Sequence, residues 1–270
     1  MTIKYLDSKR ISALSSDTKP TNVETNSILV EKDTGKRYWN DGTAWTLESP
    51  VTLISGLKLW LDASDTTTIT KDGSNLVSVW GDKSGEGNDL AQATGSSQPL
   101  WVDSVLNSKP IIRGDGVNDT ITRATFTGGE ESQINTILLV CKVGTTGTSD
   151  NKYVFDSGVT LKRHLLTNNT ASNEYLLFAS TIALIGTPDT NYNVFTLEFN
   201  NTSSILRRQK IQLGTGTVGT DALNGFTLFS AFDGGQSSNA DIAEVLVYNK
   251  QLTTTDRDDI EQYLTAKWGL

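Results

Sequence analysis

The fold is decided by the stretch Asp241-Ile-Ala-Glu-Val-Leu-Val-Tyr-Asn249 and by the segment from Thr254 to Leu270 that follows it. The first stretch is short, apolar and rich in β-branched residues, which is typical of a buried strand. In the second, apolar residues recur at i, i+3, i+4 and i+8, so they share one helical face. They are Ile260, Tyr263, Leu264 and Trp268. We therefore expect the chain to close with a core strand, a short turn and an amphipathic helix.

Both ends of this helix carry capping signals. A threonine hydroxyl from residues 253–255 can accept a free backbone N–H, and Thr253 stands three residues before Asp256, as in a capping box. Acidic residues gather near the positive end of the helix dipole, and Lys267 lies near the negative end. Gly269 can adopt the left-handed conformation that stops a helix. The pattern predicts that this helix packs on the core, with no role in binding.

Short strand signals separated by Gly, Asn and Asp turns fill the chain from residue 51 to the closing helix. In Gly56-Leu-Lys-Leu-Trp-Leu-Asp62, alternation puts Leu57, Leu59 and Leu61 on one face and Trp60 on the other. Further inward-facing sets are Phe195, Leu197 and Phe199, and Phe226, Leu228 and Phe232. The candidate strands are 76–80, 110–113, 136–143, 152–155, 175–180, 192–200, 204–213, 226–232 and 241–248. The sequence predicts an all-β, jelly-roll β-sandwich over residues 51–270.

Residues 1–50 form a smaller unit with a polar loop at 15–26 and three short strand signals after it. We expect a β-meander over strands 27–31, 36–39 and 43–47. A unit of this size buries little by itself. Its aromatic residues Tyr38, Trp39 and Trp45 are therefore expected to pack against the main domain or a neighbouring subunit. The segment is predicted to serve in attachment or oligomerisation.

Composition narrows the classes of partner. The net charge of −8 argues against nonspecific binding to nucleic acid. The basic cluster Leu206-Arg-Arg-Gln-Lys210 is typical of a solvated hairpin edge. No segment approaches ~20 consecutive apolar residues, so no membrane insertion is expected. The first residues lack the apolar run of a signal peptide.

Calcium is the ion that the acidic loops favour, since it prefers carboxylate and carbonyl oxygens. The candidate ligands are Asp115 and Asp119 in one loop, and Asp233 and Asp241 in and after another. The same residue types also form ordinary turns. No cofactor is required by the sequence, and no Cys/His cluster indicates zinc.

Catalytic constellations are not evident in the sequence. Glycoside hydrolysis needs two carboxylates across the scissile bond, and Asp241 and Glu244, three apart on a strand, are expected on opposite faces. Glu31-Lys-Asp33 has two acids but lies outside the sandwich. The single histidine, His164, is expected in a surface strand or turn, and the single cysteine, Cys141, in a core strand. No catalytic residue is assigned.

Carbohydrate binding would use aromatic rings for stacking. Trp101 and Tyr153 are candidates, although such residues are more often core in a sandwich. Asn118, Asn168, Asn200 and Asn201 begin N-x-S/T sequons, which matter only in a host that glycosylates proteins.

Three segments carry a resemblance to a known family. They are Gly56-Leu-Lys-Leu-Trp-Leu-Asp-Ala-Ser64, Val79-Trp-Gly-Asp-Lys-Ser-Gly-Glu-Gly-Asn-Asp-Leu-Ala-Gln92 and the closing strand with its helix. Together they resemble the laminin-G-like, concanavalin A-like jelly-roll modules of microbial surface and viral structural proteins. Lys109 to Asp119 is similar to a strand-and-turn element of that family, with Arg113 where an apolar residue is usual. The first 47 residues resemble N-terminal segments of tail, fibre and capsid-associated proteins of marine phages and archaeal viruses.

This resemblance implies a non-enzymatic structural protein on the surface of a virus particle, as a capsid decoration protein or a tail or fibre component. It would be made in the host cytoplasm without a signal peptide. Its partners would be other virion proteins and further copies of itself, with a trimer preferred. The alternative is a carbohydrate-binding module for host cell-surface glycans, with calcium as an optional ion.

Overall fold

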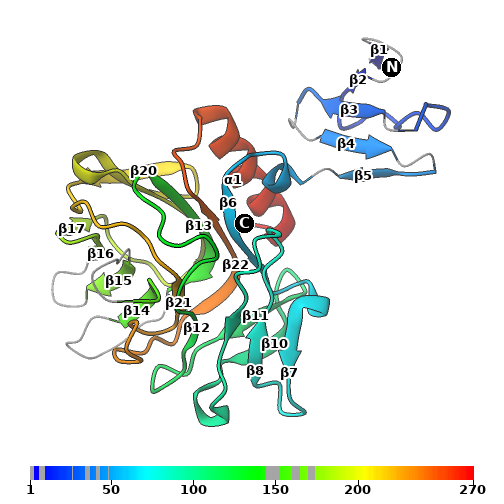
Figure 1. The fold of residues 1–270 in the computed structure, drawn as a ribbon. Helices are drawn as coiled ribbons and strands as arrows, with labels where there is room; N and C mark the ends of the chain where they lie inside the picture. The colour runs from blue at the N-terminus through cyan, green and yellow to red at the C-terminus, as the bar shows by residue number, and fades with distance from the viewer. Residues whose placement is uncertain are drawn as a thin grey trace.

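The computed structural model describes residues 3–5, 10–25, 27–33, 37–40, 43–47, 49–143, 152–159, 165–169 and 174–270. Two antiparallel sheets enclose one large apolar core, and a single α-helix, α1 (Thr254–Trp268), follows the last strand (Figure 1). The prediction of an all-β sandwich with a C-terminal helix is confirmed. The described residues also include four short 3₁₀ helices: η1 (Pro50–Thr52), η2 (Thr66–Thr68), η3 (Gly95–Ser97) and η4 (Asn201–Ser203).

The first sheet has eight strands, in the order β10-β11-β22-β13-β18-β19-β20, with β6 paired to β22 beside β11. Its strands are β6 (Leu57–Asp62), β10 (Leu100–Leu106), β11 (Lys109–Arg113), β13 (Asn135–Lys142), β18 (Tyr192–Phe199), β19 (Ser204–Arg208), β20 (Ile211–Gly216) and β22 (Asp241–Tyr248). The last strand thus lies near the middle of the sheet.

The second sheet has nine strands, in the order β17-β16-β15-β14-β21-β12-β9-β8-β7. They are β7 (Ile69–Lys71), β8 (Val77–Trp80), β9 (Leu90–Ala91), β12 (Ile121–Arg123), β14 (Lys152–Asp156), β15 (Leu165–Asn169), β16 (Glu174–Phe178), β17 (Ile182–Ile185) and β21 (Phe226–Leu228). Since successive segments of the chain alternate between the two sheets, both contribute to one core.

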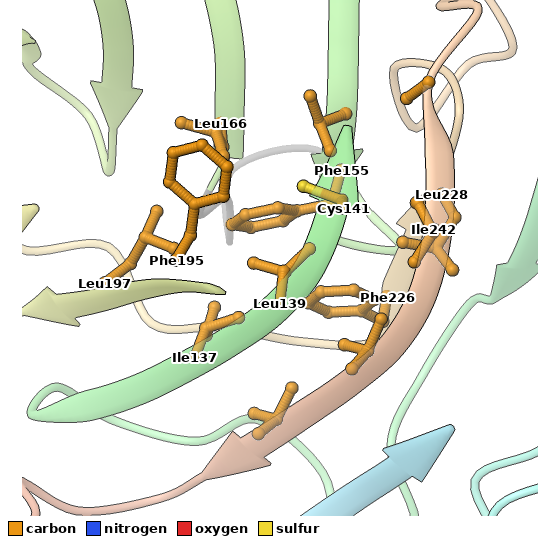
Figure 2. Close-up of a cluster of buried hydrophobic side chains, with 14 of the residues drawn as sticks. Ile137, Leu139, Cys141, Phe155, Leu166, Phe195, Leu197, Phe226, Leu228 and Ile242 are labelled. Carbon is orange, nitrogen blue, oxygen red and sulfur yellow. The ribbon is translucent and has the colours of Figure 1, made fainter. Parts of the chain in front are cut away.

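The space between the sheets is filled by aromatic and branched apolar side chains (Figure 2). Tyr175 of the second sheet meets Phe195 of the first edge-on, with ring centroids 5.3 Å apart. Phe155 and Phe226 stack with centroids 5.0 Å apart. Cys141 is buried in this core, as predicted, and burial raises the pKa of its thiol. The Tyr175–Phe195 contact joins the two sheets, whereas Phe155 and Phe226 stack within the second one.

Helix α1 begins and ends where its capping signals place it. The Thr253 hydroxyl accepts the Asp256 N–H at 3.1 Å, and Gly269 has a left-handed φ of 70°. Ile260, Leu264 and Trp268 are buried in an apolar cluster on the outer face of the eight-stranded sheet. The helix therefore covers the side of that sheet that faces away from the sandwich core.

Buried carboxylates hold the helix on the sheet. Glu244 of β22 accepts hydrogen bonds from Trp60 Nε1 at 2.8 Å and from Trp268 Nε1 at 2.7 Å, and pairs with Lys267 Nζ at 2.7 Å. Lys267 also contacts Asp62 at 2.8 Å. Burial by itself lowers the pKa of Lys267, but the Glu244 and Asp62 carboxylates raise it above its ordinary value. The ammonium group is thereby held charged in a dry site.

Further along the helix, two more buried glutamates make similar contacts. Glu198 of β18 pairs with Arg257 at 3.0 Å, and Glu261 of α1 pairs with Arg207 of β19 at 3.1 Å. Glu261 also accepts the Thr196 hydroxyl at 2.7 Å. The outer face thus combines an apolar cluster with satisfied charges.

A β-bulge in β22 corrects one prediction. Val140 pairs with Glu244, but Cys141 pairs with Ile242, so Ala243 is an extra residue. Ile242 and Val245 face the core, whereas Ala243 lies in the outer cluster. Asp241 and Glu244 therefore point to the same outer face, and the prediction of opposite faces was wrong. The cause is that an extra residue interrupts the two-residue period.

Other strand predictions need smaller corrections. Leu57 packs in the outer cluster beside Trp60, because the register with β22 shifts between Val247 and Tyr248. The predicted strand 204–213 is a hairpin of β19 and β20. Its two turn residues, Gln209 and Lys210, have φ of 50° and 67° without the usual Asn or Gly. Phe232 lies beyond β21, which ends at Leu228.

The N-terminal segment forms a sheet with five strands in chain order. They are β1 (Lys4–Tyr5), β2 (Arg10–Ala13), β3 (Ile28–Glu31), β4 (Arg37–Asn40) and β5 (Trp45–Leu47), with β2 and β3 parallel. Tyr38 and Trp45 pack on a small cluster of this segment itself. Their packing against the main domain or a neighbouring subunit stays a prediction. Trp45 Nε1 donates to the Pro20 carbonyl at 2.7 Å, and Lys19 Nζ lies 4.0 Å from the Tyr38 ring centroid. The loop over residues 14–25 thus supplies the groups that contact the Tyr38 and Trp45 side chains. The side chain of Trp39 is not among those that the structure describes, so its packing stays a prediction.

No described helix has both the length and the apolar character needed to cross a membrane. The division into residues 1–50 and 51–270 as separate domains stays a prediction.

We predict that Glu244→Gln lowers the free energy of unfolding by about 3 kcal/mol, because the amide presents an N–H group to a site already filled with donors and leaves Lys267 less compensated. Urea unfolding followed by circular dichroism measures this loss. Glu24→Gln, at an exposed position, is the matched control and should change stability by less than about 0.5 kcal/mol. Equal stabilities for the two variants would contradict the structural role given to Glu244.

Candidate functional site

Four polar side chains from four neighbouring strands form a line on the outer face of the eight-stranded sheet. Asp241 of β22 pairs with Arg113 of β11 on one side and with Lys142 of β13 on the other, and Lys142 pairs with Tyr192 of β18. Their neighbours Ile112, Cys141 and Ile242 face the core. Because side chains alternate along a strand, these four point outward. We call Arg113, Asp241, Lys142 and Tyr192 the outer row.

Asp241 organises the outer row. Its carboxylate accepts Arg113 Nε at 2.6 Å and Arg113 Nη2 at 2.8 Å, a bidentate pair that fixes the plane of the guanidinium. The Tyr192 hydroxyl donates to the same carboxylate. The hydrogen bonds that Arg113 donates to Asp241 raise the pKa of Arg113. Burial first, and then this carboxylate, raises the pKa of Tyr192. Asp241 is 3% exposed, so its oxygens are occupied by groups of the protein.

Arg113 and Lys142 in the outer row each have N–H groups that donate to no described residue. The Arg113 side chain is 44% exposed, and its pairing with Asp241 uses only Nε and Nη2. Within the described part of the chain, Arg113 Nη1 has no acceptor. Lys142 Nζ lies 6.0 Å from the centroid of the Tyr192 ring, and no described residue accepts a hydrogen bond from it. The outer row therefore offers oriented donors at half-exposed positions on a rigid sheet.

A pre-shaped loop continues directly from Arg113. The Asp115 side chain accepts the Val117 N–H at 2.8 Å, and the Asp119 side chain accepts the Asp115 N–H at 2.8 Å. Gly114 donates its N–H to the Ala240 carbonyl at 3.0 Å, and a Cβ at Gly114 would lie 2.4 Å from the Ser238 carbonyl. The loop is thus shaped by its own carboxylates and held closely against residues 238–240 through Gly114.

Among the predicted site residues, Asp119 has the most strongly shifted pKa. It is 5% exposed. Burial raises the pKa of its carboxyl to about 6; the hydrogen bond from Asp115 N–H opposes that rise and the Asp115 charge adds to it.

The four predicted calcium ligands do not gather in one place. Asp115 and Asp119 belong to the same turn, Asp233 accepts the Gly235 N–H at 3.0 Å in another, and Asp241 is committed to Arg113 and Tyr192. The residues described here include no group of three or more acidic, His or Cys side chains placed to hold a metal ion. Calcium binding stays a prediction.

The other predicted residues also have defined positions. Trp101 is half-buried against the sandwich core, with Lys71 Nζ 4.7 Å from its ring centroid, and Tyr153 is half-buried on β14. Neither ring is presented as a fully open stacking surface. Asn118 donates from Nδ2 to the Ser96 carbonyl at 2.8 Å, while Asn201 is exposed. Glu31 pairs with Lys19 at 2.9 Å inside the N-terminal sheet. His164 and the side chain of Asn168 lie outside the described residues.

The outer row was not predicted as a unit. The one signal in the sequence was Arg113, a charge at a strand position where an apolar residue is usual in the resembled family. Its partner lies 128 residues away in the chain, so only the strand register reveals the pair.

No family model matches this sequence, and no curated protein does. Solved structures do match its fold. Trypanosoma rangeli sialidase in complex with the inhibitor DANA is 12% identical, with a TM-score of 0.55 over 96% of this chain and 47% of that one. The same sialidase with sialic acid is 13% identical, with a TM-score of 0.55 over 88% and 44%.

The botulinum neurotoxin serotype D binding domain also matches. It is 11% identical, with a TM-score of 0.56 over 82% of this chain and 56% of that one. The chain spans less than half of the sialidases and little more than half of the neurotoxin domain, and at these identities the likeness shows the fold alone. The β-sandwich part of the predicted resemblance is supported. Nothing in these matches indicates a virus, so the viral origin stays a prediction.

The prediction that this protein is not an enzyme needs correction. It was drawn from a resemblance to structural and binding modules and from the lack of a catalytic motif. The solved structures that share the fold include sialidases, which are enzymes. A non-enzymatic role therefore does not follow from this fold. At these limits of identity and coverage, the likeness does not assign sialidase activity to this chain.

We predict that Asp119→Asn stabilises the protein at neutral pH. The folded-state pKa of about 6 lies above the unfolded value near 3.9. The wild type therefore loses stability as pH rises from about 4 to about 6, because only the unfolded state ionises easily. Asparagine keeps an oxygen that can accept the Asp115 N–H. Urea unfolding should show a gain of about 1–2 kcal/mol at pH 7 and none at about pH 3.5.

Asp103→Asn, at an exposed position of β10, is the control and should show no such pH dependence. A gain for Asp119→Asn that is equal at both pH values would exclude ionisation of Asp119 as its cause.

Proposed function

We propose that the sandwich is a carbohydrate-binding module and that the outer row is its binding surface. The observation that carries this proposal is a rigid line of Arg113, Asp241, Lys142 and Tyr192 whose outward donors have no acceptor among the described residues. Sugars are recognised by fixed polar groups placed beside an aromatic surface, and the outer row combines both. Because the pair with Asp241 fixes the Arg113 guanidinium beforehand, little conformational entropy of that side chain is lost on binding.

The comparisons support this proposal at the level of fold. The solved structures of similar fold include a sialidase in complex with sialic acid and the receptor binding domain of botulinum neurotoxin D. Sandwiches of this shape can therefore occur in proteins that contact carbohydrates or receptors. The residues that would do so here are this chain's own.

We predict that Lys142→Gln weakens carbohydrate binding by about tenfold, about 1.4 kcal/mol, because it removes the charge of one free donor without disturbing a hydrogen bond of the fold. A panel of oligosaccharides, screened on an array and then titrated by calorimetry, identifies and measures the ligand. Lys109→Gln, at the other end of β11, is the matched control. The proposal fails if no oligosaccharide binds, or if both variants bind like the wild type.

We also propose, as a second function, that residues 1–50 attach the protein to a virus particle, as a capsid decoration, tail or fibre component that presents the sandwich outward. The observation that favours this is the separate five-stranded sheet, whose described strands pair with none of the sandwich strands. Strands β1 and β5 are its edges, and unpaired strand edges favour pairing with another chain. Other virion proteins, and further copies of this chain, are the proposed partners.

We predict that the full chain is a trimer and that residues 51–270 alone are monomeric, since the edge strands β1 and β5 lie in the removed segment. Light scattering after size exclusion gives both masses, and circular dichroism checks that the shortened chain keeps its β-sheet signal. An oligomer that survives the deletion would place the contact in the sandwich and remove this support for attachment through residues 1–50.

A further inference from the structure

We infer that the ligand of the outer row is an acidic carbohydrate, bound through a carboxylate between Arg113 and Lys142. This inference rests on the proposed carbohydrate-binding function and specifies the class of ligand. It follows from which hydrogen-bonding groups of the outer row are occupied and which are free.

The acceptors of the outer row are already in use. The Asp241 carboxylate accepts two hydrogen bonds from Arg113 and one from the Tyr192 hydroxyl, and it is almost fully buried. A neutral sugar carries hydroxyls that donate as well as accept, so it needs acceptors from the protein. A carboxylate only accepts. A surface whose carboxylate is already occupied and whose free charged groups are donors therefore fits an acidic ligand better than a neutral one.

The charge of the outer row points the same way. Arg113 and Lys142 contribute two positive charges and Asp241 one negative charge, which leaves the row net positive. The whole chain carries a net charge of −8. A positive site on an acidic protein concentrates anions locally, whereas the surrounding surface repels them.

Nearby carboxylates do not occupy the free donors of the outer row. Asp189, close to the start of β18, is paired with Arg208 at 2.9 Å and accepts the Asn193 side-chain amide at 2.8 Å. Asp115, beyond Arg113, accepts the N–H groups of its own turn. These carboxylates are held by other partners, so the two free cationic groups of the outer row remain available.

The spacing suits a group that bridges the two cations. β11 and β13 are separated by β22, so Arg113 and Lys142 stand about 10 Å apart at their Cα atoms. Their long side chains can converge on one carboxylate above Asp241. In this arrangement Arg113 and Lys142 contact the ligand, while Asp241 is a positioning residue that holds the guanidinium plane through Nε and Nη2 and turns Nη1 outward.

Sulfated sugars share the acceptor-only chemistry and therefore form a separate arm of the test. We favour the carboxylate because its planar shape matches a guanidinium group. The probes are tetragalacturonate, the neutral galactose tetramer of the same linkage, and a sulfated form of that neutral tetramer.

The experiment is calorimetric titration of the full chain with each probe, at about 20 mM and about 500 mM salt. We expect tetragalacturonate to bind at least about tenfold more tightly than either other probe. High salt should reduce that preference. Lys142→Gln and Arg113→Lys should each lower affinity for the acidic probe by about tenfold, with circular dichroism showing both variants folded. Arg113→Lys keeps a positive charge beside Asp241 but cannot form the bidentate hydrogen bonds that fix the side chain. Lys109→Gln should bind like the wild type.

Other outcomes separate the two proposals. Equal binding of the acidic and neutral probes, both weakened by Lys142→Gln, would overturn the acidic class but keep the outer row as a carbohydrate site. A preference for the sulfated probe would show that the site binds a sulfate group and would overturn the inference of a carboxylate. Acidic binding that neither variant changes would place the site elsewhere and overturn this inference. No binding of these probes or of the wider oligosaccharide panel would remove the proposed function as well.

Discussion

The carboxylate of Glu244 joins the three elements on which the outer face depends. It lies on the last strand, accepts the indole N–H of Trp60 from β6, and takes the Lys267 ammonium and the Trp268 indole N–H from α1. Removing a carboxylate from water costs several kcal/mol unless its oxygens are satisfied. Here donors from both neighbours satisfy them, so the sheet edge and the helix can only assemble together. Glu198 and Glu261 repeat the arrangement along the helix.

This anchoring also determines where the surface stays open. The contacts that tie α1 to β22 end at Glu244, and the outer row begins on the other side of the bulge at Ala243. The same strand therefore serves two purposes. Its C-terminal part is buried under the helix, while its first residue, Asp241, orients a half-exposed arginine. A rigid sheet is a better support for such a group than a free loop, since each side chain is placed by the register of its strand.

Signals that act over a few residues could be predicted closely. The cap at Thr253, the stop at Gly269 and the buried face of α1 all depend on neighbours within one or two turns. The inward residues of β18 followed from simple alternation. Features that depend on the partner strand could not be predicted. The bulge at Ala243 and the pairing of Arg113 with Asp241 exist only in the register between strands far apart in the chain. The short strands β9 and β12 carry too few residues for a period to be visible.

The bulge has a consequence for how this protein can vary between relatives. Residues 233–236 are a surface turn, where an added or lost residue would be absorbed locally. At the bulge itself the loss of Ala243 would also be absorbed, since Ile242 and Glu244 would then pair with Cys141 and Val140 in regular alternation and no side chain would change face. In the regular part of the strand, from Val245 to Tyr248, a single deletion would instead turn every preceding side chain to the other face, with Asp241 pointing into the apolar core and Ile242 outward. The loss of one residue should therefore be tolerated in the turn and at the bulge, and excluded from the regular part of the strand that follows the bulge.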